Sequence, residues 1–120
     1  MNAERICDFI GKDNITVVDA MEKIDRNARG VLFILDGDGK LSGALSDGDI
    51  RRWIMNSGEI SSPVSNVMNK HPKYLTIEDK IDAFNVMKEK SITAIPLVDN
   101  EDRIVDIVLL SEYVILSTVL

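Results

Sequence analysis

Cysteine and aromatic residues are scarce in this sequence. Cys7 is the single cysteine, and Phe, Trp and Tyr together make up 5% of the 120 residues. One cysteine cannot form a disulfide within the chain, which favours a reducing, cytoplasmic location. We expect Cys7 to be a small, nearly buried hydrophobic side chain rather than a reactive thiol.

Positive charge is in deficit. The chain has 14 Lys and Arg against 20 Asp and Glu, which gives a formal net charge of −6. Because nucleic acids are bound through basic patches, this composition argues against a nucleic-acid partner.

Uninterrupted hydrophobic runs are too short to cross a bilayer. The most apolar tract is IVDIVLLSEYVILSTVL at 104–120, which Asp106 and Glu112 interrupt. A membrane helix needs about 20 consecutive apolar residues, so the tract predicts a buried strand and a helix, with no membrane partner. The N-terminus lacks the basic start and apolar run of a signal peptide. The tract ends without a polar tail, which is compatible with the chain being a piece of a longer protein.

Residue arrangements typical of catalysis or metal binding are missing. His71 is the single histidine, and no Ser-His-acid order, Walker loop or metal quartet is present. The run DGDGK at 36–40 is similar to the start of a calcium loop, but Lys40 and Asp47 occupy two ligand positions that an EF-hand gives to other residues. We predict no catalytic residue, no metal and a hairpin turn at 36–40.

The sequence does contain an internal repeat, at 15–54 and 75–116. Each copy opens with an apolar residue, a threonine and, three positions later, an aspartate: ITVVD begins at Ile15 and LTIED at Leu75. This spacing is typical of a helix-capping box. Apolar steps of three and four then predict a buried helix face in each copy, formed by Val17, Met21, Ile24 and Ala28 in the first and by Ile77, Ile81, Phe84 and Met87 in the second.

Two short apolar runs follow each predicted helix and indicate a β-hairpin. They are VLFILD (31–36) and LSGAL (41–45) in the first copy, and AIPLVD (94–99) and IVDIVLL (104–110) in the second. A final helix is predicted from Asp49 and from Ser111. The fold class is therefore α/β (α+β), with β-α-β-β-α repeats at 13–56 and 73–120. The linker at 57–72 has a short helical piece near Val64–Met68.

One repeat alone is too small to support a core. We therefore expect the two copies to pack around a pseudo-two-fold axis as one module over 1–120. Clefts between internal copies are favoured ligand sites.

The ordered motifs resemble a tandem pair of CBS domains, a family named after cystathionine β-synthase. They are TVVDA from Thr16, GALSDGDIRR from Gly43, VMNKHP from Val67 and IPLVD from Ile95. The resemblance implies a regulatory, non-enzymatic module that binds an adenosine-containing ligand such as AMP, ADP, ATP or S-adenosylmethionine. It also implies a homodimer, with a face near Trp53 and Leu116, and an attached or partner catalytic domain.

The family's ribose motif is complete in the first copy at Gly43, Ser46 and Asp49. The resemblance implies that Asp49 accepts from two ribose hydroxyls, that Ser46 donates to a sugar or phosphate oxygen, and that Gly43 permits close approach. The alternative for the serine and the aspartate is capping of a helix. Further candidate ligand residues are Thr16, Arg52 near phosphate, and Ile15 and Phe33 around adenine; the alternatives are a solvated position for Arg52 and packed core for the apolar pair.

The second copy departs from the ribose motif. Asp106, Leu109 and Glu112 stand at its glycine, serine and aspartate positions, so we predict one competent cleft or none. The leucines and SDGDIRR resemble CBS pairs attached to sugar-phosphate nucleotidylyltransferases, and pairs attached to sugar-phosphate isomerases are also similar. The predicted function is control of such an enzyme by an adenine nucleotide. The alternative is a ligand-free dimerisation or scaffold module.

Overall fold

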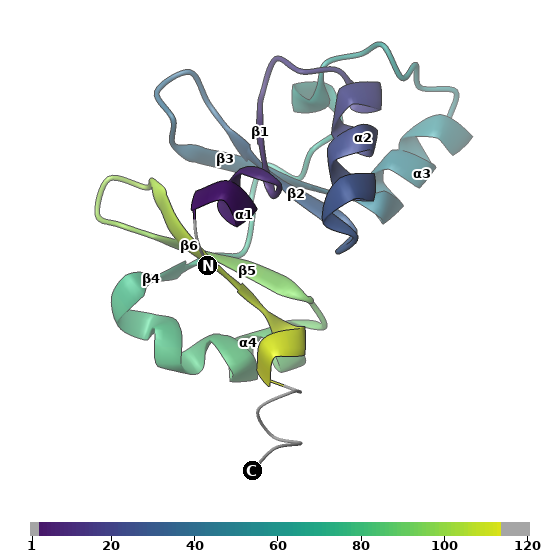
Figure 1. Ribbon diagram of the computed structural model, residues 1–120. Helices are drawn as coiled ribbons and strands as arrows, with labels where there is room; N and C mark the ends of the chain where they lie inside the picture. Colours follow the sequence, from purple (N-terminus) through teal and green to yellow (C-terminus); the bar gives the residue numbers. More distant parts are fainter. Residues whose placement is uncertain (1–2, 114–120) are drawn as a thin grey trace. The chain divides into compact units, whose positions relative to one another are not determined.

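The computed structural model describes residues 3–113 (Figure 1). The chain has a mixed α/β fold with two three-stranded sheets, which confirms the predicted fold class. It divides into two compact units between Pro72 and Lys73, each with its own sheet and core.

The first unit has a sheet of order β1-β2-β3. Its elements are α1 (Ala3–Cys7), β1 (Ile10–Lys12), α2 (Val17–Asn27), β2 (Val31–Leu35), β3 (Leu41–Ser46), α3 (Asp47–Met55) and the 3-10 helix η1 (Val64–Asn66). β1 is parallel to β2, so α2 is a crossover connection, and β2 is antiparallel to β3, as the predicted hairpin requires. η1 lies inside the helical piece predicted in the linker.

Helices α2 and α3 pack on one face of this sheet. Leu32 and Ile34 of β2 form a core cluster with Ala20 and Ile24 of α2 and Ile50 of α3. The spacing of four between the α2 residues places them on one side of the helix. Each fully buried Leu or Ile contributes about 1.5–3 kcal/mol, so this face fixes α3 and the residues at its start.

The second unit repeats the plan with a sheet of order β4-β5-β6. Its elements are β4 (Leu75–Thr76), the 3-10 helix η2 (Ile77–Asp82), α4 (Ala83–Lys90), β5 (Ala94–Val98) and β6 (Ile104–Leu109). Residues 110–113 are helical. The remainder of the final helix predicted from Ser111, with Leu116, lies outside the described residues.

The two hairpins share one register. Ile34 pairs with Gly43 in the first unit and Leu97 pairs with Asp106 in the second, and a β-bulge follows this pair in each hairpin. The repeat inferred from the sequence is therefore present in the backbone pairing, including its irregularity.

An aspartate closes each hairpin turn. Asp36 Oδ1 accepts from the backbone N–H groups two and four residues later, at 2.9 and 3.0 Å. Asp99 Oδ1 accepts in the same way, at 2.8 and 3.1 Å. The N–H groups of Arg103 and then Glu101 stabilise the ionised carboxylate and lower the pKa of Asp99. The DGDGK run is thus a turn held by its own first aspartate.

The repeats differ at the start of their first helix, where the prediction of two matching helices is wrong. In the first unit the helical segment runs from the cap Thr16 to the left-handed residue Ala28. In the second unit the corresponding segment runs from Thr76 to the left-handed residue Ser91 and is three residues longer. The additional residues belong to η2, a 3-10 helix that precedes α4.

This insertion changes which residues face the core. Counted back from the left-handed residue, Ala83 and Met87 take the positions of Ala20 and Ile24, and all four are buried. Two predicted core residues are exposed instead, Ile77 by 50% and Ile81 by 86%. A 3-10 helix has about 3.0 residues per turn, so the spacing that predicts a buried α-helical face does not apply to η2.

Three predictions for the first unit are also wrong. Cys7 is exposed, because it ends α1, a five-residue helix with no buried side chain. Met21 is 37% exposed on the outer side of α2, and Ala28 is exposed as the left-handed C-cap of that helix. The sequence reasoning missed α1, and the first strand, Ile10–Lys12, precedes residue 13, where the first repeat was expected to begin.

Candidate functional site

Ser46 and Asp49 form a capping box at the start of α3. The backbone N–H of Asp49 donates to Ser46 Oγ at 3.1 Å, and the N–H of Ser46 donates to Asp49 Oδ2 at 2.9 Å. The positive end of the helix dipole favours a carboxylate at this place. The capping alternative for these two residues is therefore realised.

The capping box leaves hydrogen-bonding capacity on both side chains. Ser46 Oγ accepts one bond, and across residues 3–113 its hydroxyl proton has no acceptor. Each carboxylate oxygen has two acceptor positions; Asp49 uses one on Oδ2 for Ser46 and one on Oδ1 for Arg52, at 3.0 Å. The Asp49 side chain is 25% exposed. Capping α3 and accepting a pair of ligand hydroxyls are therefore compatible.

Two guanidinium groups lie over the first turn of α3. The Arg52 side chain is 64% exposed and pairs with Asp49. A Cβ built on Gly48 would lie 3.1 Å from Arg52 Nη1 and 3.6 Å from Arg51 Nη2. The missing side chain at Gly48 leaves room for both guanidinium groups, of which Arg52 pairs with the Asp49 carboxylate. Sequence reasoning named Arg52 but missed Gly48, for which the signal was its place directly before Asp49.

The space beside Gly43 is filled by residues of its own unit. A Cβ there would lie 2.5 Å from Met68 Sδ and 3.0 Å from the Asn69 carbonyl oxygen. The next residue, Ala44, exchanges two backbone hydrogen bonds with Asn69, at 3.0 and 2.8 Å. Glycine is therefore needed here because the linker backbone crosses β3 closely.

The other three predicted ligand residues also lie in the first unit. Thr16 caps α2 through a capping box with Asp19, with both bonds at 3.2 Å. Ile15 is partly buried against the core cluster. Phe33 is 2% exposed, and strand alternation places it on the opposite face of β2 from Leu32. Across residues 3–113, only Arg52 of the further candidates joins the Ser46–Asp49 cluster by a hydrogen bond.

The second unit lacks this chemistry at the equivalent positions. Asp106 occupies the position of Gly43, and its Oδ2 accepts from Lys80 Nζ at 3.3 Å. Leu109 occupies the position of the cap Ser46; it is buried and has no hydroxyl. Glu112, at the position of the ribose aspartate, is exposed.

Residues 3–113 contain neither a metal-binding cluster nor a membrane-spanning helix. No cluster of three or more His, Cys, Asp or Glu side chains that could hold a metal ion occurs there. In the same range no helix combines the length and hydrophobicity that crossing a membrane requires. His71 is exposed, and its backbone N–H donates to Asn69 Oδ1 at 3.0 Å, which makes it part of the linker turn.

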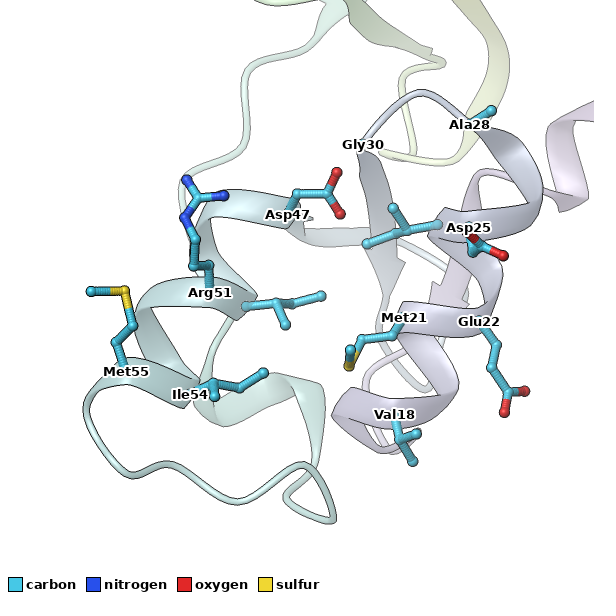
Figure 2. Close-up of a pocket in the computed structure, with 12 residues that line it drawn as sticks. Val18, Met21, Glu22, Asp25, Ala28, Gly30, Asp47, Arg51, Ile54 and Met55 are labelled. Carbon is cyan, nitrogen blue, oxygen red and sulfur yellow. The ribbon is translucent and has the colours of Figure 1, made fainter.

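Sequence reasoning missed a groove of about 940 Å³ between α2 and α3 (Figure 2). Its lining includes four exposed apolar side chains: Val18 (36%), Met21 (37%), Ile54 (44%) and Met55 (74%). Glu22 and Asp25 of α2 and Arg51 of α3 add charges of both signs. The available signal was the presence of apolar residues on the outer side of both helices.

Relatives of this chain include sugar-phosphate isomerases. The arabinose 5-phosphate isomerase GutQ of Shigella flexneri is 30% identical over 99 residues, covering 82% of this chain and 31% of the relative. GutQ of Escherichia coli (strain K12) is 29% identical with the same coverage. The chain therefore spans about a third of the length of these relatives. They match the isomerase resemblance and do not show the link to nucleotidylyltransferases.

Solved structures share the fold. The CBS domain protein PAE2072 from Pyrobaculum aerophilum, complexed with AMP, is 15% identical with a TM-score of 0.75, covering 92% of this chain and 89% of that one. The CBS domain pair of protein MJ0100, in complex with 5′-methylthioadenosine and S-adenosyl-L-methionine, is 22% identical with a TM-score of 0.76, covering 91% and 90%. The sequence model of the CBS domain matches residues 12–56 and 64–114. This chain belongs to the CBS domain family as a tandem pair, and the matched regions are regulatory rather than catalytic domains.

Proposed function

We propose that this CBS pair is a cytoplasmic regulatory module that binds an adenine nucleotide of the AMP, ADP or ATP type in its first repeat. Asp49 accepts from the ribose hydroxyls, Ser46 donates to a sugar or phosphate oxygen, and Arg52 neutralises phosphate. The observation that carries the proposal is the capacity that remains on Ser46 and Asp49 after they cap α3. The AMP and S-adenosylmethionine bound to the structural neighbours support the adenosine class.

We further propose that the ligand acts on an attached or partner enzyme of sugar-phosphate metabolism, of the isomerase or the nucleotidylyltransferase kind. The isomerase relatives support this class. Control requires that the ligand binds two states of the module with unequal affinity. In this proposal the repeats are residues 13–56 and 73–120, the linker is 57–72, and the second repeat, with Asp106 and Leu109, offers no equivalent site.

Ligand-induced stabilisation tests the proposal, with Asp49→Asn as the variant. Asparagine keeps an oxygen for the Ser46 N–H but loses the charge and acceptor capacity that the hydroxyl pair needs. Thermal unfolding is measured with AMP, ADP, ATP and S-adenosylmethionine. A ligand at 100 times its Kd adds about 2.7 kcal/mol of stability. We expect this gain in the wild type and its loss in Asp49→Asn.

Asp19→Asn is the matched control, because Asp19 forms the same capping box at α2. It should lose helix-capping stability without losing the ligand-induced gain. Equal ligand gains in all three proteins would contradict the role of Asp49. No gain with any of the four ligands in the wild type would contradict nucleotide binding altogether.

The α2–α3 groove favours a second function, assembly of a homodimer that supports a neighbouring catalytic domain. Its exposed apolar side chains, Met55 above all, would be buried by the same face of another copy. Arg51 on one copy and Glu22 on the other have opposite charges, which suits a self-complementary face.

A further inference from the structure

Two arginines follow the Ser46–Asp49 capping box, and only one of them has a partner. Arg52 Nη2 donates to Asp49 Oδ1 at 3.0 Å. Arg51 is exposed and makes no hydrogen bond or ion pair with another residue of the range 3–113. A guanidinium group carries five N–H donors and stays charged at ordinary pH. The Arg51 side chain is therefore a cation that is available to a ligand.

Carboxylates line the α2–α3 groove together with Arg51 but do not pair with it. Asp47 lies four residues before Arg51 on α3. A Cβ built on Gly30 would lie 3.1 Å from Asp47 Oδ2, so the Asp47 carboxylate lies beside the start of β2. Figure 2 shows the head groups of Asp47 and Arg51 pointing in different directions. Glu22 and Asp25 line the groove from α2, and neither forms an ion pair with Arg51.

The two guanidinium groups share the space that Gly48 leaves open. Arg52 Nη1 and Arg51 Nη2 lie 3.1 and 3.6 Å from the point that a Cβ of Gly48 would occupy. Like charges this close repel each other, and the Asp49 carboxylate offsets only one of them. Asp49, Arg51 and Arg52 together thus keep one positive charge, in a chain whose net charge is −6. An anion over Gly48 would relieve the repulsion and bond to both guanidinium groups.

The geometry of α3 sets the order in which a ligand would meet these groups. At about 100° per residue, the order around the helix is Asp49, Arg52, Gly48 and Arg51. A ribose held at Asp49 would therefore have its first phosphate beside Arg52. A second phosphate would lie over Gly48 and reach Arg51. A ligand with one phosphate, or with none, would leave Arg51 without a partner.

We propose that Arg51 is a specificity-determining residue through which the site selects a nucleoside diphosphate or triphosphate over AMP and S-adenosylmethionine. This inference rests on the proposed nucleotide site and adds to it one residue and a narrower ligand class. Arg52 binds the phosphate next to the ribose, and Arg51 binds the following phosphate through charge-assisted hydrogen bonds. Gly48 serves the same selection, because any side chain there would occupy the space between the two guanidinium groups.

Titration calorimetry of the full chain with AMP and with ADP tests this role. The measured quantity is the ratio of the Kd for AMP to the Kd for ADP within each protein, so a change in overall stability or assembly cancels. A hydrogen bond to a charged group is strong enough to change a Kd about ten-fold. We expect a ratio of about ten in the wild type and of about one in Arg51→Gln, with the AMP affinity nearly unchanged.

Two further variants separate a contact of Arg51 from the general effect of charge. Arg51→Lys keeps the positive charge but loses the planar fork, so it should retain part of the preference for ADP. Arg26→Gln removes one positive charge from the last turn of α2 and should keep the wild-type ratio. Circular dichroism checks that each variant is folded, which the exposure of both arginines leads us to expect.

The possible results separate this selectivity from the nucleotide site itself. Equal Kd values for AMP and ADP in the wild type would overturn the role of Arg51 and leave the nucleotide site standing. A preference for ADP that persists in Arg51→Gln, or that is lost equally in Arg26→Gln, would also overturn it. Pyrophosphate that binds as tightly as ADP would show that the ribose is not recognised. Binding of neither nucleotide to the wild type would contradict the proposed function as well.

Discussion

At the residue scale, Ser46 and Asp49 illustrate why a binding motif and a helix cap are hard to separate in a sequence. Both features require a hydroxyl and, three residues later, a carboxylate at the start of a helix. The pattern predicted the places of both residues at the start of the helix. The structure shows that the two capping bonds form and leave hydrogen-bonding capacity on both side chains. The reason for Gly43 could not be predicted, because its tight neighbours, Met68 and Asn69, belong to the linker.

Replacing Gly43 with alanine should destabilise the first unit even when no ligand is present. The added methyl group would meet the Asn69 carbonyl oxygen at 3.0 Å, and a backbone atom cannot move aside as a side-chain end can. Overpacking of this kind costs about 1–3 kcal/mol. Urea unfolding of Gly43→Ala measures the loss. Gly37→Ala is the control, because no atom lies within 4 Å of its added Cβ, and its stability should stay within about 0.5 kcal/mol of the wild type.

At the element scale, hairpins were easier to predict than helix starts. Short apolar runs rich in branched residues, followed by Asp36 or Asp99, predict a β-hairpin in each unit. Both hairpins form as expected. The Thr-x-x-Asp pattern at Thr76 has the same letters as that at Thr16, yet it does not cap its helix. Thr16 is bridged by Pro63 of the linker, and Thr76 is instead part of strand β4, so the two threonines have different surroundings among residues 3–113. Such long-range support leaves no local sequence signal.

The turn of the second hairpin should depend on acid through Asp99. Two backbone N–H groups bond its carboxylate and hold its pKa below the ordinary value of about 3.9. A carboxyl group whose pKa is lower in the folded state adds stability above its unfolded pKa and loses it as the pH falls. Asp99→Asn should therefore be less stable than the wild type at pH 7, and the difference should narrow below about pH 4. Unfolding curves at pH 7 and below about pH 4 measure the difference in stability between the two proteins. A difference that does not change with pH would contradict the lowered pKa of Asp99.

At the scale of the whole molecule, a substitution in the α2–α3 groove tests the dimer hypothesis. Introducing a charge at Met55, which is 74% exposed, should separate a dimer without disturbing the core. Light scattering of the wild type should give twice the 13.4 kDa mass of one chain, and Met55→Asp should give that mass once. Val105→Asp adds the same charge on β6 and should remain dimeric. A wild type that is monomeric at high concentration would refute this use of the groove.

The capping bonds at α3 carry a consequence for the affinity and selectivity of recognition. Because they hold the Asp49 carboxylate in place beforehand, a nucleotide would meet a preorganised acceptor and sacrifice little rotamer freedom there. Selectivity among ligands would then come from the groups left mobile, above all the guanidinium of Arg52, which is largely in solvent. Ribose capture and discrimination by phosphate number would thus reside in separate side chains three residues apart on one helix.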